Sequence, residues 1–158
     1  EGESGSGNAG LATTSPPPVW PGFRRLNVTG IERECDSVIS IRLDDPDGAP
    51  LPPARPGQYL TVRIRPETEP RALLRNYSLS GPPEAGYYRI AVKREPAGAV
   101  SGYLHTRLRV GAQLEIAAPR GTFILDTTNA PVLLMSVGIG ATPVLAMLNA
   151  LATEHADR

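Results

Sequence analysis

The chain has 158 residues, and its 16 Lys and Arg balance 16 Asp and Glu, so the formal net charge at pH 7 is zero. A neutral chain without a local basic run lacks the electrostatic footprint of a nucleic-acid-binding protein, and no stretch approaches the roughly 20 apolar residues that a membrane span needs. With Cys35 as its only cysteine, the chain excludes an internal disulfide and an all-cysteine metal site. We expect a soluble, cytoplasmic domain in which Cys35 is buried, without nucleic-acid or membrane partners.

Residues 1–21 are rich in Gly, Ser, Thr and Pro. Such a segment has little apolar surface to bury and is predicted to be a disordered linker, following or cut from another module. The barrel domain is expected over 22–128, and a second domain is expected to begin over 129–158.

From Phe23 onward the apolar residues alternate with a period of two, as in half-buried strands. Six short segments show this pattern between clusters of Pro, Gly and Asp: Arg25–Arg33, Val38–Leu43, Gln58–Arg65, Leu74–Ser80, Tyr87–Arg94 and Gln113–Ala117. One helix is predicted over Ser101–Leu108. Closure into a barrel removes unpaired strand edges, so the predicted fold is an all-β, six-stranded antiparallel Greek-key barrel with one helix.

The pattern changes after Pro131. Residues 132–137 are almost continuously apolar, as in a parallel strand buried on both faces, and lead into the turn Gly138–Pro143. A helix with Pro143 in its first turn is predicted next, with an apolar stripe of Leu145, Leu148, Leu151 and Ala152. This order is typical of the first βα unit of an α/β nucleotide-binding domain.

Arg75 and Tyr77 fall on the same face of a predicted strand. A guanidinium binds phosphate oxygens and a phenol ring stacks on a flat ring, so this face suits a phosphorylated aromatic ligand. Ser78 points to the other face and reaches such a ligand only through its backbone or through a bend in the strand. Tyr59 lies on the preceding strand. A surface arginine beside a half-buried tyrosine would show the same pattern.

Gly98–Ser101 precedes the predicted helix, with Ser101 as the expected N-cap. A helix start exposes backbone amides that bind phosphate, although a plain capped helix needs the same residues. His105 and His155 are far apart and lack acidic or cysteine neighbours, so no metal site is expected.

Six motifs occur in a fixed order: Pro56–Tyr59, Arg75–Ser78, Ile90–Arg94, Gly98–Leu104, Ala118–Gly121 and Gly138–Pro143. Together, over Phe23 to Leu151, they resemble the ferredoxin–NADP reductase superfamily, and especially the reductase half of flavohaemoglobins. The resemblance implies a flavin-binding barrel followed by an NAD(P)H-binding α/β domain, which is truncated here.

By this resemblance Arg75 holds the flavin phosphate, Tyr77 stacks on the isoalloxazine and Tyr59 is a second aromatic contact. Ser78 and Thr142 are the implied catalytic residues beside the reacting rings. The full implied cofactor-binding set is Tyr59, Arg75, Asn76, Tyr77, Ser78, Val92, Lys93, Gly98, Ala99, Val100, Ser101, Gly138, Ile139, Gly140, Ala141, Thr142 and Pro143. Ala99 stands where many relatives carry a glycine.

The expected function is a flavin-binding module that passes electrons from NAD(P)H through FAD to a haem or iron–sulfur acceptor, possibly on the same polypeptide. The helix start suits a pyrophosphate and so favours FAD over the alternative FMN; NADH and NADPH are not distinguished. By itself the chain is expected to have weak or no activity. The alternative is a flavin-free barrel that binds a partner or regulates. An oligonucleotide-binding barrel is disfavoured by the neutral charge and by only eight aromatic residues, 2 Phe, 1 Trp and 5 Tyr.

Overall fold

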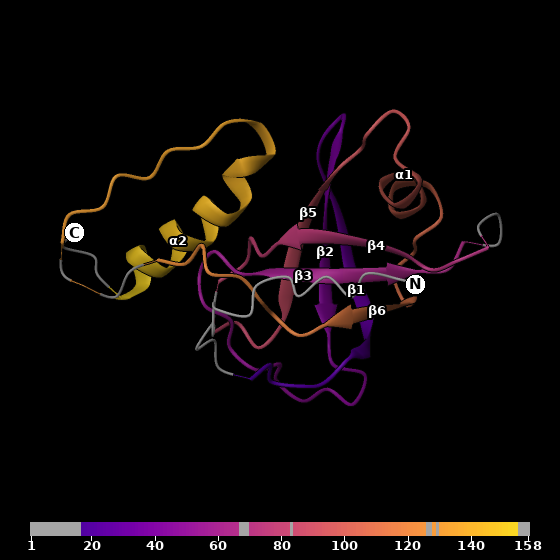
Figure 1. The fold of residues 1–158 in the computed structure, drawn as a ribbon, viewed down its shortest axis with the longest axis horizontal. Coiled ribbons are helices and arrows are strands. Elements are labelled where there is room, and N and C mark those ends of the chain that lie inside the picture. The colour runs from indigo at the N-terminus through magenta and orange to yellow at the C-terminus, as the bar shows by residue number, and fades with distance from the viewer. Residues whose placement is uncertain (1–16, 67–69, 83, 126–127, 129, 155–158) are drawn as a thin grey trace, which may run out of the picture.

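The computed structural model describes residues 17–66, 70–82, 84–125, 128 and 130–154. Six antiparallel strands form one sheet in the order β4-β3-β6-β1-β2-β5 (Figure 1). Their bounds are β1 Phe23–Cys35, β2 Val38–Asp44, β3 Tyr59–Ile64, β4 Leu73–Ser78, β5 Tyr88–Lys93 and β6 Gln113–Ala117. The six predicted strands are therefore confirmed, each end to within two residues.

The strands follow a Greek-key path, because β2 and β3 are consecutive in the chain but lie apart in the sheet, as do β5 and β6. The expected full closure of the barrel is wrong. Strands β4 and β5 form no ladder and meet only after Ser78, at a bridge between Leu79 and Ile90 and a 2.8 Å hydrogen bond from the Ser80 amide to the Arg89 carbonyl. Helix α1 (Ala99–Thr106) packs against both strands.

The core lies inside the curled sheet, where every second strand residue points inward. These inward residues are at most 4% exposed: Leu26, Val28, Ile41, Leu43, Leu60, Val62, Ile64, Ile90, Val92, Leu114 and Ile116. Val100 and Leu104 of α1 add to this core. Trp20, which falls in the predicted linker, is also buried in it. Cys35 is exposed beside the β1–β2 turn, so the prediction of a buried thiol is wrong.

The segment after Pro131 departs from its prediction. Residues 132–137 form no strand, and their side chains reach 93% exposure at Val137. A parallel strand needs neighbours to complete its backbone hydrogen bonds, and none of the described strands pairs with this segment.

A 3₁₀ turn, η1 (Gly138–Gly140), leads into helix α2 (Ala141–Glu154), which lies at the opposite end of the molecule from α1 (Figure 1). The predicted apolar stripe of α2 is wrong, because Leu145 and Leu148 are exposed while Ala146, Met147 and Ala150 are buried. No helix in the described ranges is long and apolar enough to cross a membrane.

Candidate functional site

The face of β4 that carries Arg75 and Tyr77 adjoins the core. In the β3–β4 ladder Tyr77 lies opposite Leu60, and Arg75 lies opposite Val62. Tyr77 is half-buried against the core, whereas Arg75 is exposed. The Arg75 guanidinium donates to the carbonyl of Leu74 at 2.7 Å, and no carboxylate of the described residues pairs with it. A cation and an aromatic ring thus share one accessible face, as the sequence predicts.

The phenol of Tyr77 remains protonated over the whole physiological range. Burial raises the pKa of Tyr77 to about 12, and the nearby positive charge of Arg75 opposes the increase. A neutral, half-buried ring is suited to stacking rather than to proton transfer.

The opposite face of β4 carries Asn76 and Ser78. Tyr59 lies directly opposite Ser78 in the ladder, and the Thr61 hydroxyl donates to the Asn76 side-chain oxygen at 2.8 Å. The ring of Tyr59 packs over Gly121, where an added Cβ would be 3.0 Å from the ring. Register therefore places Tyr59 with Ser78, on the face away from Tyr77.

Strand β5 contributes its last residues next to α1. The Val92 side chain is fully buried, so only its backbone faces outward, and Nε2 of His105 lies 2.9 Å from the Val92 carbonyl oxygen. Lys93 is exposed and lies 3.7 Å from the carboxylate of Glu95. Of these two predicted contacts, Lys93 alone presents a side chain to solvent.

The N-terminus of α1 is capped by Gly98, without a side-chain hydrogen bond. The prediction of Ser101 as N-cap is wrong: it is a buried first-turn residue whose hydroxyl donates to the Gly98 carbonyl at 3.2 Å and accepts from the Glu95 amide at 3.1 Å. A side chain at Gly98 would lie only 2.4 Å from the Ser101 hydroxyl, so this turn requires glycine. Val100 is buried, whereas Ala99 is exposed.

The turn Gly138–Pro143 lies across a pocket of about 410 Å³ from the barrel. The Thr142 hydroxyl donates to the Ile139 carbonyl at 2.9 Å, which holds the start of α2. The barrel wall of the pocket is formed by Glu34, Val38, Ser80, Arg89 and Ala91. Ser80 follows Ser78 by two residues, so the pocket lies next to the end of the β4 motif.

Sequence reasoning missed Glu34, Ser80 and Arg89. Strand alternation could have placed Arg89 and Ala91 together on the outer face of β5. Residues 136–148 lie across the pocket from that face, and no local sequence pattern predicts this tertiary contact.

Residues 26–124 match the oxidoreductase FAD-binding domain family. The chain belongs to that family. The matched segment lies wholly within the predicted barrel domain, residues 22–128.

Individual relatives agree with this assignment. A flavohemoprotein of Oceanobacillus iheyensis is 42% identical over 144 residues, which is 88% of this chain but 36% of that protein. The flavohem-like FAD/NAD-binding domain of nitric oxide dioxygenase from Vibrio cholerae has a TM-score of 0.80 at 37% identity and covers 84% of this chain and 58% of that one. Phthalate dioxygenase reductase has a TM-score of 0.77 at 37% identity, covering 85% and 41%. The chain thus spans about a third of the curated relative.

Proposed function

We propose that this FAD-binding domain carries electrons from NAD(P)H to a haem or iron–sulfur acceptor within a larger oxidoreductase. The single observation that carries the proposal is the shared face of Arg75 and Tyr77 on β4, a strand that contacts α1. Relatives support both acceptor classes, since one is a flavohemoprotein and another is a reductase for electron transfer from pyridine nucleotides to [2Fe-2S]. We place the activity in the cytoplasm.

The donor set fits FAD. The exposed guanidinium of Arg75 and the amides at the start of α1, which lack a side-chain cap, suit a pyrophosphate. The neutral ring of Tyr77 suits one face of the isoalloxazine. When bound, FAD supplies hydride acceptance and one-electron transfer, chemistry that belongs to the cofactor.

The site residues of the chain then have positioning roles. Arg75 neutralises phosphate charge, Gly98 permits the tight turn before α1, and Tyr77 excludes water from one side of the flavin ring. In the proposal Ser78, whose side chain lies on the other face of β4, is a hydrogen-bond partner at the reacting edge through its backbone. Val92, Val100 and the internally bonded Ser101 contribute through their backbones.

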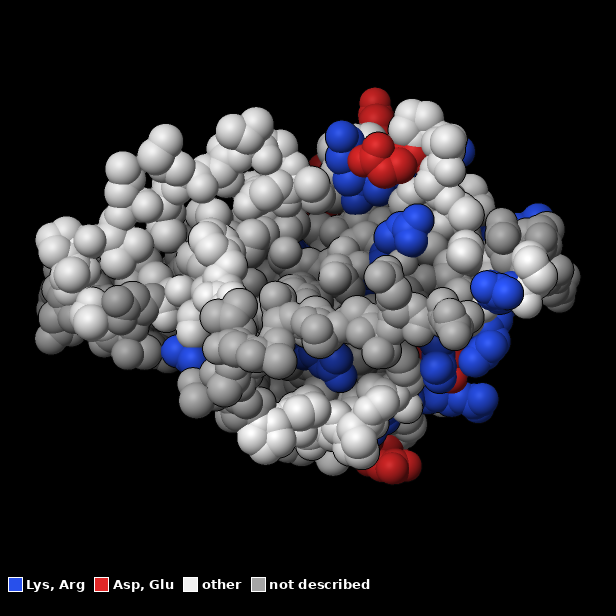
Figure 2. Space-filling model, viewed as in Figure 1, with Lys and Arg blue, Asp and Glu red and all other residues white. Residues whose placement is uncertain are grey.

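Residues 130–154 are proposed to be the first βα unit of an NAD(P)-binding domain. No charged residue occurs between 130 and 153, and the end of the molecule that holds α2 is mostly white in Figure 2, with blue only at its lower edge. Leu133, Met135 and Val137 are 78–93% exposed there. Neighbouring strands of a parallel sheet would cover these side chains, and the Vibrio cholerae relative is an FAD/NAD-binding domain. We expect weak or no NAD(P)H turnover from these 158 residues alone.

Flavin retention after desalting tests the proposal. We expect the chain to retain FAD, and Arg75→Ala to weaken FAD binding about tenfold or more, because a hydrogen bond to a charged group is lost. Tyr77→Leu should weaken binding as well, whereas Tyr77→Phe, which keeps the ring, should not. Arg25→Ala, an exposed arginine on β1, is the matched control. A folded wild-type chain that retains no FAD would contradict the proposal.

A further inference from the structure

A connected polar cluster lies on the outer surface of the barrel, at the pocket beside α2. The Arg89 guanidinium donates to both the Ser80 hydroxyl, at 3.2 Å, and the Glu34 carboxylate. The Ser40 hydroxyl donates to the same Glu34 oxygen, Oε1, at 2.6 Å. Arg89 is held from β5, Ser40 from β2 and Glu34 from β1, so three strands fix these groups in place.

The cluster leaves one carboxylate oxygen of Glu34 and three of the five guanidinium N–H groups of Arg89 unused, among them Nε–H. No described residue donates to Oε2 of Glu34, and Nε of Arg89 has no acceptor among the described residues. Both side chains line the 410 Å³ pocket. Ile139, Val144, Leu145 and Leu148 line its other side, so the pocket combines an apolar wall with one polar edge.

We infer that Arg89 and Glu34 bind the carboxamide of a nicotinamide ring in this pocket. The ligand class rests on the proposed function, which supplies NAD(P)H as the co-substrate. A carboxamide has one acceptor and two donor hydrogens, so its oxygen matches Arg89 and its NH₂ group matches Glu34. The apolar wall and Thr142, at the first turn of α2, enclose the rest of the ring.

Other ligand classes fit this edge less well. A simple anion would meet the Glu34 carboxylate, a simple cation would meet the Arg89 guanidinium, and an apolar ring would leave Oε2 of Glu34 and Nε of Arg89 without hydrogen-bond partners. The amide satisfies both at once. In this proposal Arg89 and Glu34 are specificity-determining residues supplied by the barrel rather than by the α/β segment.

Two nucleotides that differ only at this group test the inference. Nicotinamide mononucleotide carries the amide, whereas nicotinic acid mononucleotide carries a carboxylate. Saturation-transfer NMR titrations of the 158-residue chain, with and without FAD, give both affinities. We expect the wild type to prefer the amide about tenfold, because a carboxylate lacks the NH₂ donor and is repelled by Glu34.

Variants of Glu34 and Arg89 test whether these two residues cause the preference for the amide nucleotide. Glu34→Gln should abolish or reverse the preference, since the repulsion is removed and Arg89 attracts the acid. Arg89→Met should weaken amide binding about tenfold, and Arg89→Lys, the milder change, should weaken it in the same direction. Arg42→Met is the control: Arg42 lies opposite Arg89 in the β2–β5 ladder but stacks on Tyr87, outside the pocket. Circular dichroism establishes that each variant is folded.

The outcomes separate the two proposals. Failure to retain FAD contradicts the proposed function. The nucleotide titrations test the carboxamide site independently, because they do not require bound FAD. No amide binding by the wild type, no preference between the nucleotides, or an equal effect of Arg42→Met would overturn the carboxamide site.

Discussion

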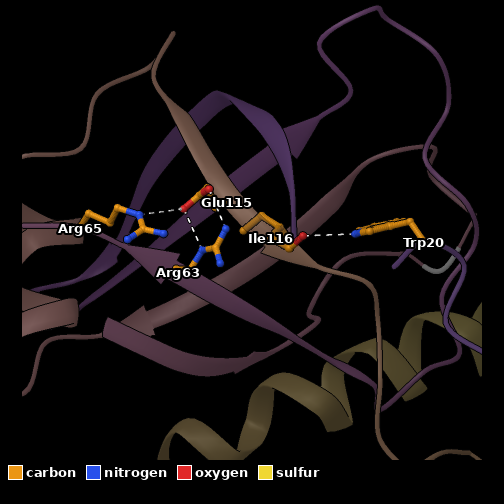
Figure 3. A network of polar contacts seen from close by, with 5 residues as sticks. All are labelled: Trp20, Arg63, Arg65, Glu115 and Ile116. Atoms are coloured by element: carbon orange, nitrogen blue, oxygen red, sulfur yellow. Dashed lines mark hydrogen bonds and ion pairs between the residues drawn. The ribbon is translucent and has the colours of Figure 1, made fainter. Parts of the chain in front are cut away.

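The indole Nε1 of Trp20 donates a hydrogen bond to the backbone carbonyl of Ile116, 3.3 Å away (Figure 3). The same ring stacks on Tyr88, with the ring centroids 6.3 Å apart and the planes inclined by 29°. Trp20 therefore joins the segment before β1 to β6 and β5. A residue outside the predicted barrel domain closes part of its core.

Replacement of this ring tests how much the leading segment stabilises the barrel. We expect Trp20→Phe to reduce the free energy of unfolding by about 1–3 kcal/mol, from the lost hydrogen bond and the cavity left behind. Urea denaturation followed by circular dichroism measures it. Val19→Ala, at a 57% exposed position, is the control and should change little. Equal effects of the two variants would mean that the packing of Trp20 is not stabilising.

Gly57 lies against the backbone of Phe123 and the side chain of Met147 from α2. A Cβ there would lie 2.0 Å from the Phe123 carbonyl oxygen and 2.6 Å from Met147 Cε, and the residue has a φ of 101°. We expect Gly57→Ala to cost about 3 kcal/mol or more, from backbone strain together with steric overlap. Denaturant unfolding measures the cost.

Gly48 supplies the matched control for Gly57. Its φ is 75°, but an added Cβ meets nothing within 4 Å. Gly48→Ala should therefore show the strain alone, about 1–2 kcal/mol. If both alanine variants lose the same stability, the packing of the Phe123 backbone and of Met147 against Gly57 is looser than the structure indicates.

The strands of the barrel could be predicted from the sequence because the patterns that define them lie within each strand and its flanking turns. Alternation of apolar residues and the Pro and Gly clusters define all six strands, and β6 matches its predicted bounds. The run 132–137 shows the limit of this reasoning. Its continuous hydrophobicity is typical of a buried parallel strand, but burial needs neighbouring strands, and no described strand lies beside it.

Some residues of the candidate site could likewise be predicted from local patterns, and others could not. The face shared by Arg75 and Tyr77 follows from strand period, and the structure places it as expected. Ser101 differs, because residue type favours an N-cap while the crowded turn at Gly98 directs its hydroxyl inward. The cluster of Glu34, Ser40 and Arg89 depends on strand order, which no local pattern encodes.

The ion pair between Arg63 and Glu115 makes stability depend on acid pH. Two hydrogen bonds of 2.8 and 2.9 Å join their side chains, and Arg65 lies 3.8 Å from the same carboxylate (Figure 3). The hydrogen bonds from Arg63 hold the pKa of Glu115 below its ordinary value of 4.5. The folded state thus binds this proton less tightly than the unfolded state, so the stabilisation is present above pH 4.5 and is lost as the pH falls through the lowered pKa.

Glu115→Gln should remove this part of the acid-side dependence and should also make stability less sensitive to salt. Unfolding midpoints measured at about pH 7 and about pH 3 give the comparison. Glu32→Gln is the control, at an exposed β1 position without an ion pair among the described residues. A Glu115→Gln variant with the pH profile of the wild type would show that the pKa of Glu115 is the same in the folded and unfolded states, and would contradict this prediction.

Tyr77 produces the opposite dependence at alkaline pH. Burial raises its pKa from 10.0 to about 12, so the unfolded chain loses the phenolic proton first. The stability that this group contributes is complete below pH 10 and is lost as the pH rises through the folded pKa. Tyr77→Phe carries no phenol, and wild-type stability should therefore fall relative to this variant between about pH 10 and about pH 12. Urea unfolding of both proteins at about pH 8 and about pH 11 measures the difference, from which the titration of lysine and of the other tyrosines cancels. A difference that does not change with pH would place the Tyr77 hydroxyl in contact with water, which would remove the desolvated ring wall that the proposed flavin site requires.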